Sequence, residues 1–249
     1  MQKEWLFDRE STREFTKVRQ EFMGEFLGHV RNACPLKSAV DLGCGVGYFA
    51  KYLSDLMFDV VAVDGRAENV AEAKSRYPEI NFVCRNVEDP LLSEIGVFDL
   101  VSCVGLLYHL ENPFLAIRNL HRLTDKVLFV ESMCAPGAQP SLQLVDEGHD
   151  EDQGLNWIAF YPTEACLVKM LYRAGFPYVY GFEKLPDHEL FHAGLWNRKQ
   201  RTMLVASKVQ LSVPGIMLLP DVRGSWEILS SRRERFQHRF ARIAGLLRR

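Results

Sequence analysis

The sequence predicts an α/β fold in which helices cover both faces of a mostly parallel sheet. Between residues 38 and 209, short apolar runs alternate with amphipathic stretches. The runs are apolar throughout instead of at every second position, which is typical of strands buried on both faces. A chain of 249 residues is long enough for one sizeable domain of this kind with extensions, or for two small domains.

The predicted elements follow one another regularly. Residues 1–32 are expected to be helical, because large apolar side chains recur there at three- and four-residue steps. Further along, Pro113 favours the start of one helix and Gly175 the end of another. The expected strands cover 38–43, 59–64, 80–85, 98–105, 126–132, 178–185 and 201–209, and the later expected helices cover 47–56, 67–77, 113–123 and 162–175.

Composition argues against several classes of protein. The start, MQKEWLFDRE, is too charged for a signal peptide, and no apolar run reaches the length of a membrane span. The six cysteines are scattered without a C-x-x-C pair, which argues against a zinc site and a disulfide framework. We therefore expect a cytoplasmic protein in a reducing compartment.

Charge is distributed unevenly along the chain. The net charge is −2, but residues 232–249 hold seven arginines and one glutamate, a local charge of +6 that leaves −8 for the remainder. An acidic body disfavours nucleic acid as a partner. The tail predicts a basic, amphipathic C-terminal helix. Such a helix packs on the domain with its basic face in water, or it contacts an anionic surface at a membrane or on a protein partner.

The stretch VDLGCGVGYF joins the first predicted strand of the sheet to the helix that follows it. Ligands of open α/β sheets bind at this end of the strands. Gly43, Gly45 and Gly47 let the backbone turn sharply and approach a ligand closely. The spacing is G-x-G-x-G, and Tyr48 stands where a dinucleotide fingerprint needs glycine or alanine. The spacing therefore weakens an interpretation as an NAD or FAD site.

Two carboxylates accompany this loop. Asp41 precedes it and suits a ligand with an ammonium group, whereas Asp64 ends the second strand, where a carboxylate accepts ribose hydroxyls. A ribose and a cationic amino acid together describe S-adenosylmethionine (SAM). With VVAVDGR and FDLVSCVGLLYHL, the loop resembles the motifs of the class I, Rossmann-like SAM-dependent methyltransferases. The resemblance covers about residues 35–208 and implies a seven-stranded sheet whose last strand is antiparallel.

The resemblance also implies a domain organisation and a cofactor site. Residues 1–34 are expected to form a helical cap, 35–208 the methyltransferase domain with a lid insertion at about 133–162, and 209–249 an extension. Asn86 stands where many members have an aspartate for the adenine amine, and its carbonyl oxygen accepts the same bond. The expected cofactor-binding residues are Asp41, Gly43, Cys44, Gly45, Gly47, Asp64, Gly65, Arg66, Asn86, Val87, Glu88, Cys103 and Val104.

Tyr108 and His109 are the expected catalytic residues. They follow the fourth strand of the predicted sheet, in a loop that the resemblance places beside the transferable methyl group. Histidine is a natural base near neutral pH for a hydroxyl acceptor, but in some members a histidine here only shapes the pocket. For Tyr108 we expect a role in orienting or stacking on the acceptor.

The predicted lid insertion contains candidate residues for the acceptor site. The run DEGHDED at 146–152 combines carboxylates with His149, but we expect a solvated acidic loop without metal, because adjacent residues in a run rarely converge on one ion. Trp157, Phe160 and Tyr161 are candidates for the acceptor wall or for aromatic packing. We predict methyl transfer to a hydroxyl, less readily an amine, of a small polar or glycan-like acceptor.

Two alternatives stay open. GLLYHLENP and NWIAFYPTEACLVKMLYRAGF are similar to enzymes that place a carboxymethyl group on the wobble uridine of tRNA. Those enzymes use carboxylated SAM and contact it through a tyrosine that Tyr108 matches, and an arginine comparable to Arg201 also serves in them. The other alternative is a non-catalytic SAM-binding subunit that docks through its arginine-rich tail.

Overall fold

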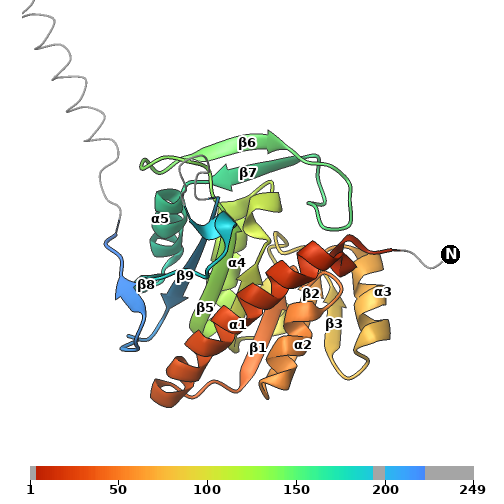
Figure 1. Cartoon of the computed structure of the whole chain (residues 1–249), viewed down its shortest axis with the longest axis horizontal. Coiled ribbons are helices and arrows are strands. Elements are labelled where there is room, and N and C mark those ends of the chain that lie inside the picture. Colours follow the sequence, from red (N-terminus) through yellow and green to blue (C-terminus); the bar gives the residue numbers. More distant parts are fainter. Residues whose placement is uncertain (1–3, 193–199, 222–249) are drawn as a thin grey trace, which may run out of the picture.

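The computed structural model describes residues 4–192 and 200–221. The strands of its main sheet are β1 (Ser38–Leu42), β2 (Asp59–Asp64), β3 (Asn81–Cys84), β4 (Phe98–Val104), β5 (Thr124–Met133), β8 (Tyr178–Phe182), β9 (Arg201–Ser207) and β10 (Ile216–Leu218). They lie in the order β10-β8-β9-β5-β4-β1-β2-β3 (Figure 1). Neighbours from β3 to β5 are parallel, and β9 is antiparallel to both β5 and β8. The predicted α/β fold with an antiparallel strand near its end is confirmed.

The main sheet has eight strands where seven were expected. The eighth, β10, lies in the proline-broken segment after residue 208 and pairs antiparallel with β8, Ile216 opposite Phe182 and Leu218 opposite Tyr180. Without it, β8 would be an edge strand with unpaired backbone groups, which an adjacent extended segment satisfies. A three-residue strand between prolines has too little periodicity to be predicted from sequence.

Helices cover both faces of the sheet. They are α1 (Glu10–Ala33), α2 (Tyr48–Asp55), α3 (Ala67–Arg76), α4 (Pro113–Leu123) and α5 (Glu164–Ala174), with 3-10 turns η1 (Leu6–Asp8), η2 (Leu92–Ile95), η3 (Leu107–His109) and η4 (Glu189–Phe191). One buried apolar cluster joins α1, α2 and α3 to the sheet, and a second joins α4 and α5 to it. The prediction that strands are apolar throughout because both faces are covered is therefore confirmed.

A hairpin that was not predicted lies outside the main sheet. It consists of β6 (Leu142–Asp146) and β7 (Ile158–Pro162), which pair antiparallel across the top of the view in Figure 1. β7 packs against η3, the turn that carries Tyr108 and His109. The side chains of β6 are mostly exposed, including Leu142 and Leu144, so this strand is not part of the buried core that the sequence pattern predicts.

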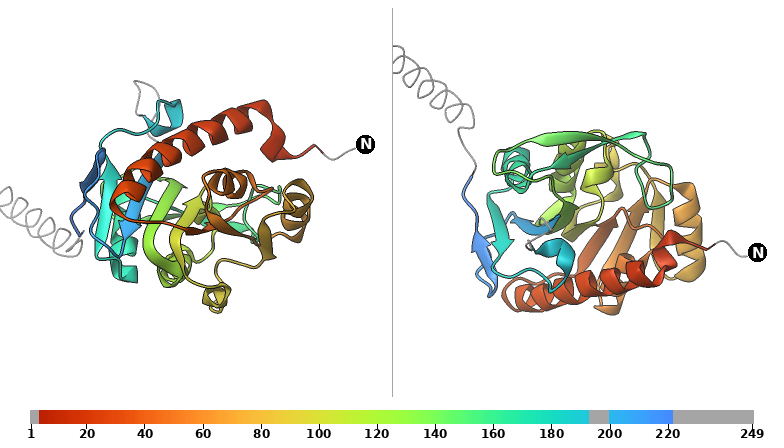
Figure 2. Two further views of the ribbon diagram at one scale, coloured as in Figure 1. Left: turned by 90° about the horizontal axis from the view of Figure 1, so that it is seen from below. Right: turned by 45° about the horizontal axis from the view of Figure 1, so that its top comes forward.

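The N-terminal segment is hydrogen-bonded to α2 and α3. Helix α1 begins at Glu10, later than predicted, because residues 6–8 form the turn η1. Asp8 in η1 accepts two hydrogen bonds from Arg76 of α3, each 2.7 Å long, and one of 2.5 Å from the Tyr48 hydroxyl. Figure 2 shows α1 running along one face of the molecule. The cap is therefore tied to the helices that follow β1 and β2.

The predicted basic C-terminal helix lies outside the described residues. Within the part that is described, no helix has both the length and the apolar composition needed to cross a bilayer.

The aromatic packing under α1 supports a test of the fold. Phe129 of β5 is fully buried, and its ring lies 5.9 Å from that of Phe26 in α1 and 6.0 Å from that of Phe182 in β8. We expect Phe129→Ala to lower the free energy of unfolding by about 3–5 kcal/mol, measured by urea denaturation. The exposed Leu91→Ala should change it by less than about 0.5 kcal/mol. Equal effects would contradict this packing.

Candidate functional site

A cavity of about 640 Å³ lies at the carboxyl ends of β1, β2 and β4. Of the residues predicted from sequence, those that line it are Gly43, Cys44, Gly45, Asp64, Gly65, Arg66, Asn86, Val87, Val104, Tyr108 and His109. The others, which are Asp41, Gly47, Glu88 and Cys103, are not among the residues that line it. Most of the predicted cofactor-binding residues and both predicted catalytic residues therefore share one cavity.

The glycine loop is a turn held against β2. The backbone N–H groups of Gly43 and Cys44 both donate to the Val63 carbonyl, over 2.8 and 3.0 Å. Gly45 has a φ of 53°, which side chains rarely tolerate, and a Cβ there would come within 2.8 Å of the Phe7 ring. The cap therefore packs directly on the loop, at a position that only glycine fills without strain.

Asp64 stands at the end of β2 as predicted, and its carboxylate is already well bonded. Oδ2 accepts the N–H of Gly45 at 2.9 Å, while Oδ1 accepts the N–H of Arg66 at 2.8 Å and the Asn69 amide at 3.2 Å. Burial raises the pKa of Asp64, and these hydrogen bonds oppose that rise. A carboxylate accepts about four hydrogen bonds, so roughly one position remains for a ligand hydroxyl.

Asp41 is buried in β1 beneath the loop. Oδ1 accepts a hydrogen bond of 3.0 Å from the Ser102 hydroxyl, and Oδ2 has no hydrogen-bond partner within the described residues. Burial, with a smaller contribution from the nearby Asp64 carboxylate, raises the pKa of Asp41 to about 7. An unpartnered buried carboxylate oxygen is a position where a cation would lower the free energy.

Asn86 and Glu88 take part in local structure. The Asn86 side-chain oxygen accepts the N–H of Glu88 at 2.9 Å, and Oε1 of Glu88 accepts the N–H of Asn112 at 2.5 Å. Asn86 lines the cavity, whereas Glu88 fixes the start of α4. Of residues 85–89, Arg85, Asn86 and Val87 therefore line the cavity, whereas Glu88 and Asp89 do not.

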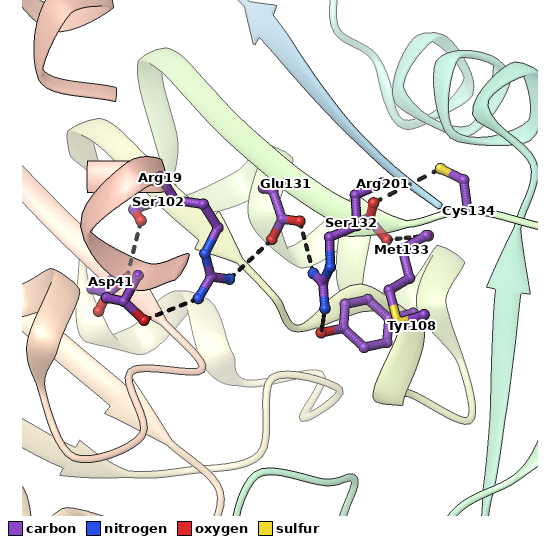
Figure 3. Close-up of polar contacts among 10 residues, drawn as sticks. Arg19, Asp41, Ser102, Tyr108, Glu131, Ser132, Met133, Cys134 and Arg201 are labelled. Atoms are coloured by element: carbon purple, nitrogen blue, oxygen red, sulfur yellow. Dashed lines mark hydrogen bonds and ion pairs between the residues drawn. The ribbon is translucent and has the colours of Figure 1, made fainter. Parts of the chain in front are cut away.

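A buried cluster of charges, drawn in Figure 3, includes Arg19, Arg201 and Tyr108, which all line the cavity. Glu131 of β5 has no exposed surface; its Oε1 accepts a hydrogen bond of 2.7 Å from Arg201 of β9, and its Oε2 one of 3.3 Å from Arg19 of α1. Arg201 also donates to the Tyr108 hydroxyl over 2.9 Å. Arginine stays protonated in proteins, so two guanidinium groups share one carboxylate and leave one net positive charge.

His109 contacts the run that was expected to be a solvated acidic loop. Its Nδ1 lies 2.9 Å from Oε2 of Glu147, whose side chain is only 5% exposed. In addition, Glu151 accepts a hydrogen bond of 2.6 Å from the N–H of Leu6. Glu147 and Glu151 thus face the cavity, whereas Asp146, His149 and Asp150 of the same run are exposed. No group of residues suited to a metal ion is found in the part of the chain that the structure describes.

The loop between β6 and β7 covers the predicted cofactor end. The Arg66 guanidinium donates to the carbonyls of Gln153 and Gly154, at distances down to 2.6 Å. The side chain of Leu155 fills the space above Gly65, 2.6 Å from where a Cβ would stand. These contacts bring the loop up to residue 155 against the cavity, which Glu147 and residues 151–155 line.

Sequence reasoning missed three residues of this site. Arg19 lies on an amphipathic helix whose pattern predicts only its apolar face, and Glu147 lies 38 residues from its partner His109. Glu131 did carry a signal, since it is a charged residue inside the apolar run KVLFVES. A charged residue in a fully buried strand needs a partner and often marks a functional site.

Comparisons with known proteins agree with this geometry. A family model described as a methyltransferase domain matches residues 40–127, which include the glycine loop, Asp64, Tyr108 and His109. Residues 40–127 are thus similar to a methyltransferase domain, which supports the resemblance to class I SAM-dependent methyltransferases. The solved N-terminal domain of EvdMO1 with S-adenosylhomocysteine (SAH) aligns at a TM-score of 0.60 with 20% identity, over 77% of this chain and 80% of that one.

A second solved methyltransferase has the same fold. The magnesium protoporphyrin IX methyltransferase of Synechocystis PCC 6803, solved with bound SAM, aligns at a TM-score of 0.54 with 19% identity, over 84% of this chain and 87% of that one. At these identities the two structures establish the fold and leave the acceptor open.

Curated relatives cover the chain in part. A tRNA U34 carboxymethyltransferase of Tolumonas auensis is 25% identical over 156 residues, 57% of this chain and 45% of that protein. A ubiquinone biosynthesis O-methyltransferase of Xanthomonas campestris is 32% identical over 92 residues, 35% of this chain and 38% of that protein. A ubiquinone biosynthesis O-methyltransferase of Cronobacter sakazakii is 30% identical over 150 residues, which are 51% of this chain and 62% of that protein. The matches thus span less than two thirds of these relatives' length.

The buried charge cluster around Glu131 gives a test of how the site is built. We expect Glu131→Gln to lower the free energy of unfolding by about 3–5 kcal/mol, because two buried guanidinium groups lose their shared counter-charge. Glu94→Gln is the control, since its ion pair with Arg85 is exposed and such pairs contribute about 0–1 kcal/mol. Urea denaturation of both variants measures the difference, and equal losses would contradict a structural role of Glu131.

Proposed function

We propose that the chain transfers a methyl group from SAM to a hydroxyl, less readily an amine, of a small polar or glycan-like acceptor. The observation that carries this proposal is one cavity of about 640 Å³ that joins the glycine loop to Tyr108 and His109. Cavities of about 300–1,000 Å³ suit small-molecule ligands, so this one has room for a cofactor and a small acceptor. The O-methyltransferase relatives support an oxygen acceptor, and the acidic body disfavours nucleic acid.

The residues present fit SAM. The unpartnered Oδ2 of Asp41 suits the cofactor's ammonium group, Asp64 its ribose, and Asn86 with Val87 its adenine. SAM supplies a methyl group made electrophilic by its bond to a sulfonium. The protein has to hold the acceptor in line with that bond and take the proton of a hydroxyl. We assign the first task to Tyr108 and the second to His109.

We also make a proposal for the acceptor class, the cellular location and the role of the basic tail. We propose a small-molecule or glycan acceptor, a cytoplasmic location, and contact of the basic tail with an anionic surface or a protein partner; the acidic body and the scattered cysteines support the first two and the arginine-rich tail the third. A SAM-binding subunit without catalysis would share the cofactor affinity and lack turnover. Release of SAH in the presence of hydroxylated small molecules distinguishes the two.

Cofactor binding is tested by calorimetry with SAM between pH 6 and pH 7.5. Because the pKa of Asp41 is raised to about 7, its carboxylate form, which binds an ammonium group, becomes populated as pH rises. The affinity for SAM should therefore increase roughly fivefold to tenfold over this range. Asp41→Asn should bind more weakly and without this pH dependence, whereas the exposed Asp59→Asn should match the wild type.

Two results would contradict the cofactor assignment. One is the absence of SAM binding while NADH binds, and the other is a pH dependence that Asp41→Asn leaves unchanged.

A second candidate function has one specific observation in its favour. Arg201 and Tyr108 are joined by a 2.9 Å hydrogen bond beside a cluster that carries one net positive charge. That arrangement suits an anionic group on the transferred carbon, as in carboxylated SAM, and a tRNA U34 carboxymethyltransferase is among the relatives. On this alternative the chain modifies the wobble uridine of tRNA.

The choice between the two cofactors is tested with Tyr108→Phe. This variant removes one hydroxyl and keeps the ring and the charge cluster. If carboxylated SAM is the cofactor, wild-type protein should bind it at least tenfold more tightly than SAM, and Tyr108→Phe should lose about tenfold of that affinity. Equal affinities for the two cofactors in wild type and variant would exclude this second candidate.

A further inference from the structure

His109 and Glu147 form a pair inside the cavity. Nδ1 of His109 lies 2.9 Å from Oε2 of Glu147, and the exposed fractions of the two side chains are 14% and 5%. The same carboxylate oxygen accepts the backbone N–H of Gly154 at 3.0 Å. Glu147 is thus held from two sides, once by the loop that it belongs to and once by the histidine.

The ionisation of Glu147 decides which nitrogen of His109 carries a proton. Burial acts to raise the pKa of Glu147, but its hydrogen bonds with His109 and the Gly154 N–H outweigh burial and lower it. Glu147 is therefore ionised at neutral pH. An ionised carboxylate only accepts hydrogen bonds, so Nδ1 must donate, and Nε2 of the neutral ring is then an acceptor.

Nε2 is available for an incoming group. Among the residues that the structure describes, it has no hydrogen-bond partner. The His109 ring also lies 4.1 Å from the Tyr108 ring, centroid to centroid, and both residues line the cavity. A neutral imidazole with a free Nε2 is the form that accepts a proton from a hydroxyl.

We propose that Glu147 is a positioning residue that keeps the proton of neutral His109 on Nδ1, so that Nε2 takes the proton of the acceptor hydroxyl. This inference rests on the proposed methyl transfer to a hydroxyl. Glu147 does not touch the acceptor; it acts through the histidine.

The close approach of the loop to η3 supports this role. A Cβ on Gly154 would come within 2.3 Å of the His109 carbonyl oxygen, so a side chain at 154 would push the loop away. The carbonyl of Gly154 also accepts a 2.6 Å hydrogen bond from Arg66, at the predicted cofactor end of the cavity. The loop that orients His109 is thus the loop that covers the cofactor end.

In the proposed step, proton transfer to His109 accompanies transfer of the methyl group. As Nε2 takes the hydroxyl proton, the oxygen forms a bond to the methyl carbon, and the carbon–sulfur bond breaks with its electron pair left on sulfur. His109 becomes an imidazolium, whose positive charge faces the Glu147 carboxylate. The proton then leaves to solvent, which restores the neutral ring and the same tautomer.

Other ionisable groups surround His109. Asp152 in the same loop interacts electrostatically with it, and burial raises the pKa of Asp152. Tyr108 lies beside it on η3, and Tyr161 of β7 contacts the Tyr108 ring at 5.8 Å. Glu147 is the only one of these groups with a hydrogen bond to the His109 ring in the described part of the chain.

The tautomer of His109 tests the proposal directly. Nitrogen-15 NMR of the full chain labelled at histidine, at a pH where the ring is neutral, distinguishes a proton on Nδ1 from one on Nε2, and His109→Gln assigns the signal. In wild-type protein we expect the Nδ1-protonated form. In Glu147→Ala the ratio of the two forms should shift toward Nε2 protonation by about tenfold or more, the effect of one hydrogen bond to a charged group.

Two further variants control this experiment. Glu147→Gln keeps the shape and a carbonyl acceptor, so it should shift the ratio in the same direction by less than Glu147→Ala. Glu111→Ala removes a different contact of the lid, the 2.7 Å hydrogen bond from Asn156, and should leave the tautomer unchanged. A wild-type ring protonated on Nε2, or a ratio that neither Glu147 variant changes, would overturn the proposal.

Failure of the proposed function gives a different result. SAM calorimetry on the same wild-type sample tests cofactor binding without reference to His109. Loss of SAM binding with a normal tautomer contradicts methyl transfer, whereas SAM binding with the wrong tautomer contradicts the role of Glu147 alone.

Discussion

The buried carboxylate of Glu131 is the interaction on which the rest of the site depends. It stands near the end of β5 and receives one guanidinium from α1 and one from β9. Neither Arg19 nor Arg201 is stable as a buried charge without it. Arg201 in turn bonds to the Tyr108 hydroxyl and so fixes the turn that carries His109. One carboxylate thereby joins the N-terminal cap, the central sheet and the residues beside the reaction centre.

The two ends of the cavity are built on different physical principles. The cofactor end consists mainly of backbone: a glycine turn whose N–H groups bond to β2, closed by Asp64 and covered by Phe7 and Leu155. The other end, where we propose that the acceptor binds, consists of ionised side chains from four separate segments of the chain. Backbone turns hold one geometry, whereas side chains on separate segments can change independently, and on our proposal these side chains select the acceptor.

The parts that could be predicted from sequence are those determined by local patterns. Continuous apolar runs and the glycine spacing predicted the sheet, the cofactor loop and the positions of Asp64 and His109 at strand ends. The hairpin β6–β7 was not predicted, because its strands are only five residues long and leucines of β6 are exposed instead of buried in a core, and β10 is too short to show a pattern. The His109–Glu147 pair joins residues 38 positions apart, a contact that only the tertiary fold creates. Contacts of this kind leave no local trace in the sequence.

The central claim is that one cavity holds the cofactor at the glycine loop with its reactive group toward Tyr108 and His109. A crystal structure of the full chain with SAH tests it most directly. We expect the ribose at Asp64, the adenine near Asn86, and the sulfur facing Tyr108 and His109. An SAH molecule bound elsewhere, or one whose sulfur points away from this pair, would contradict it.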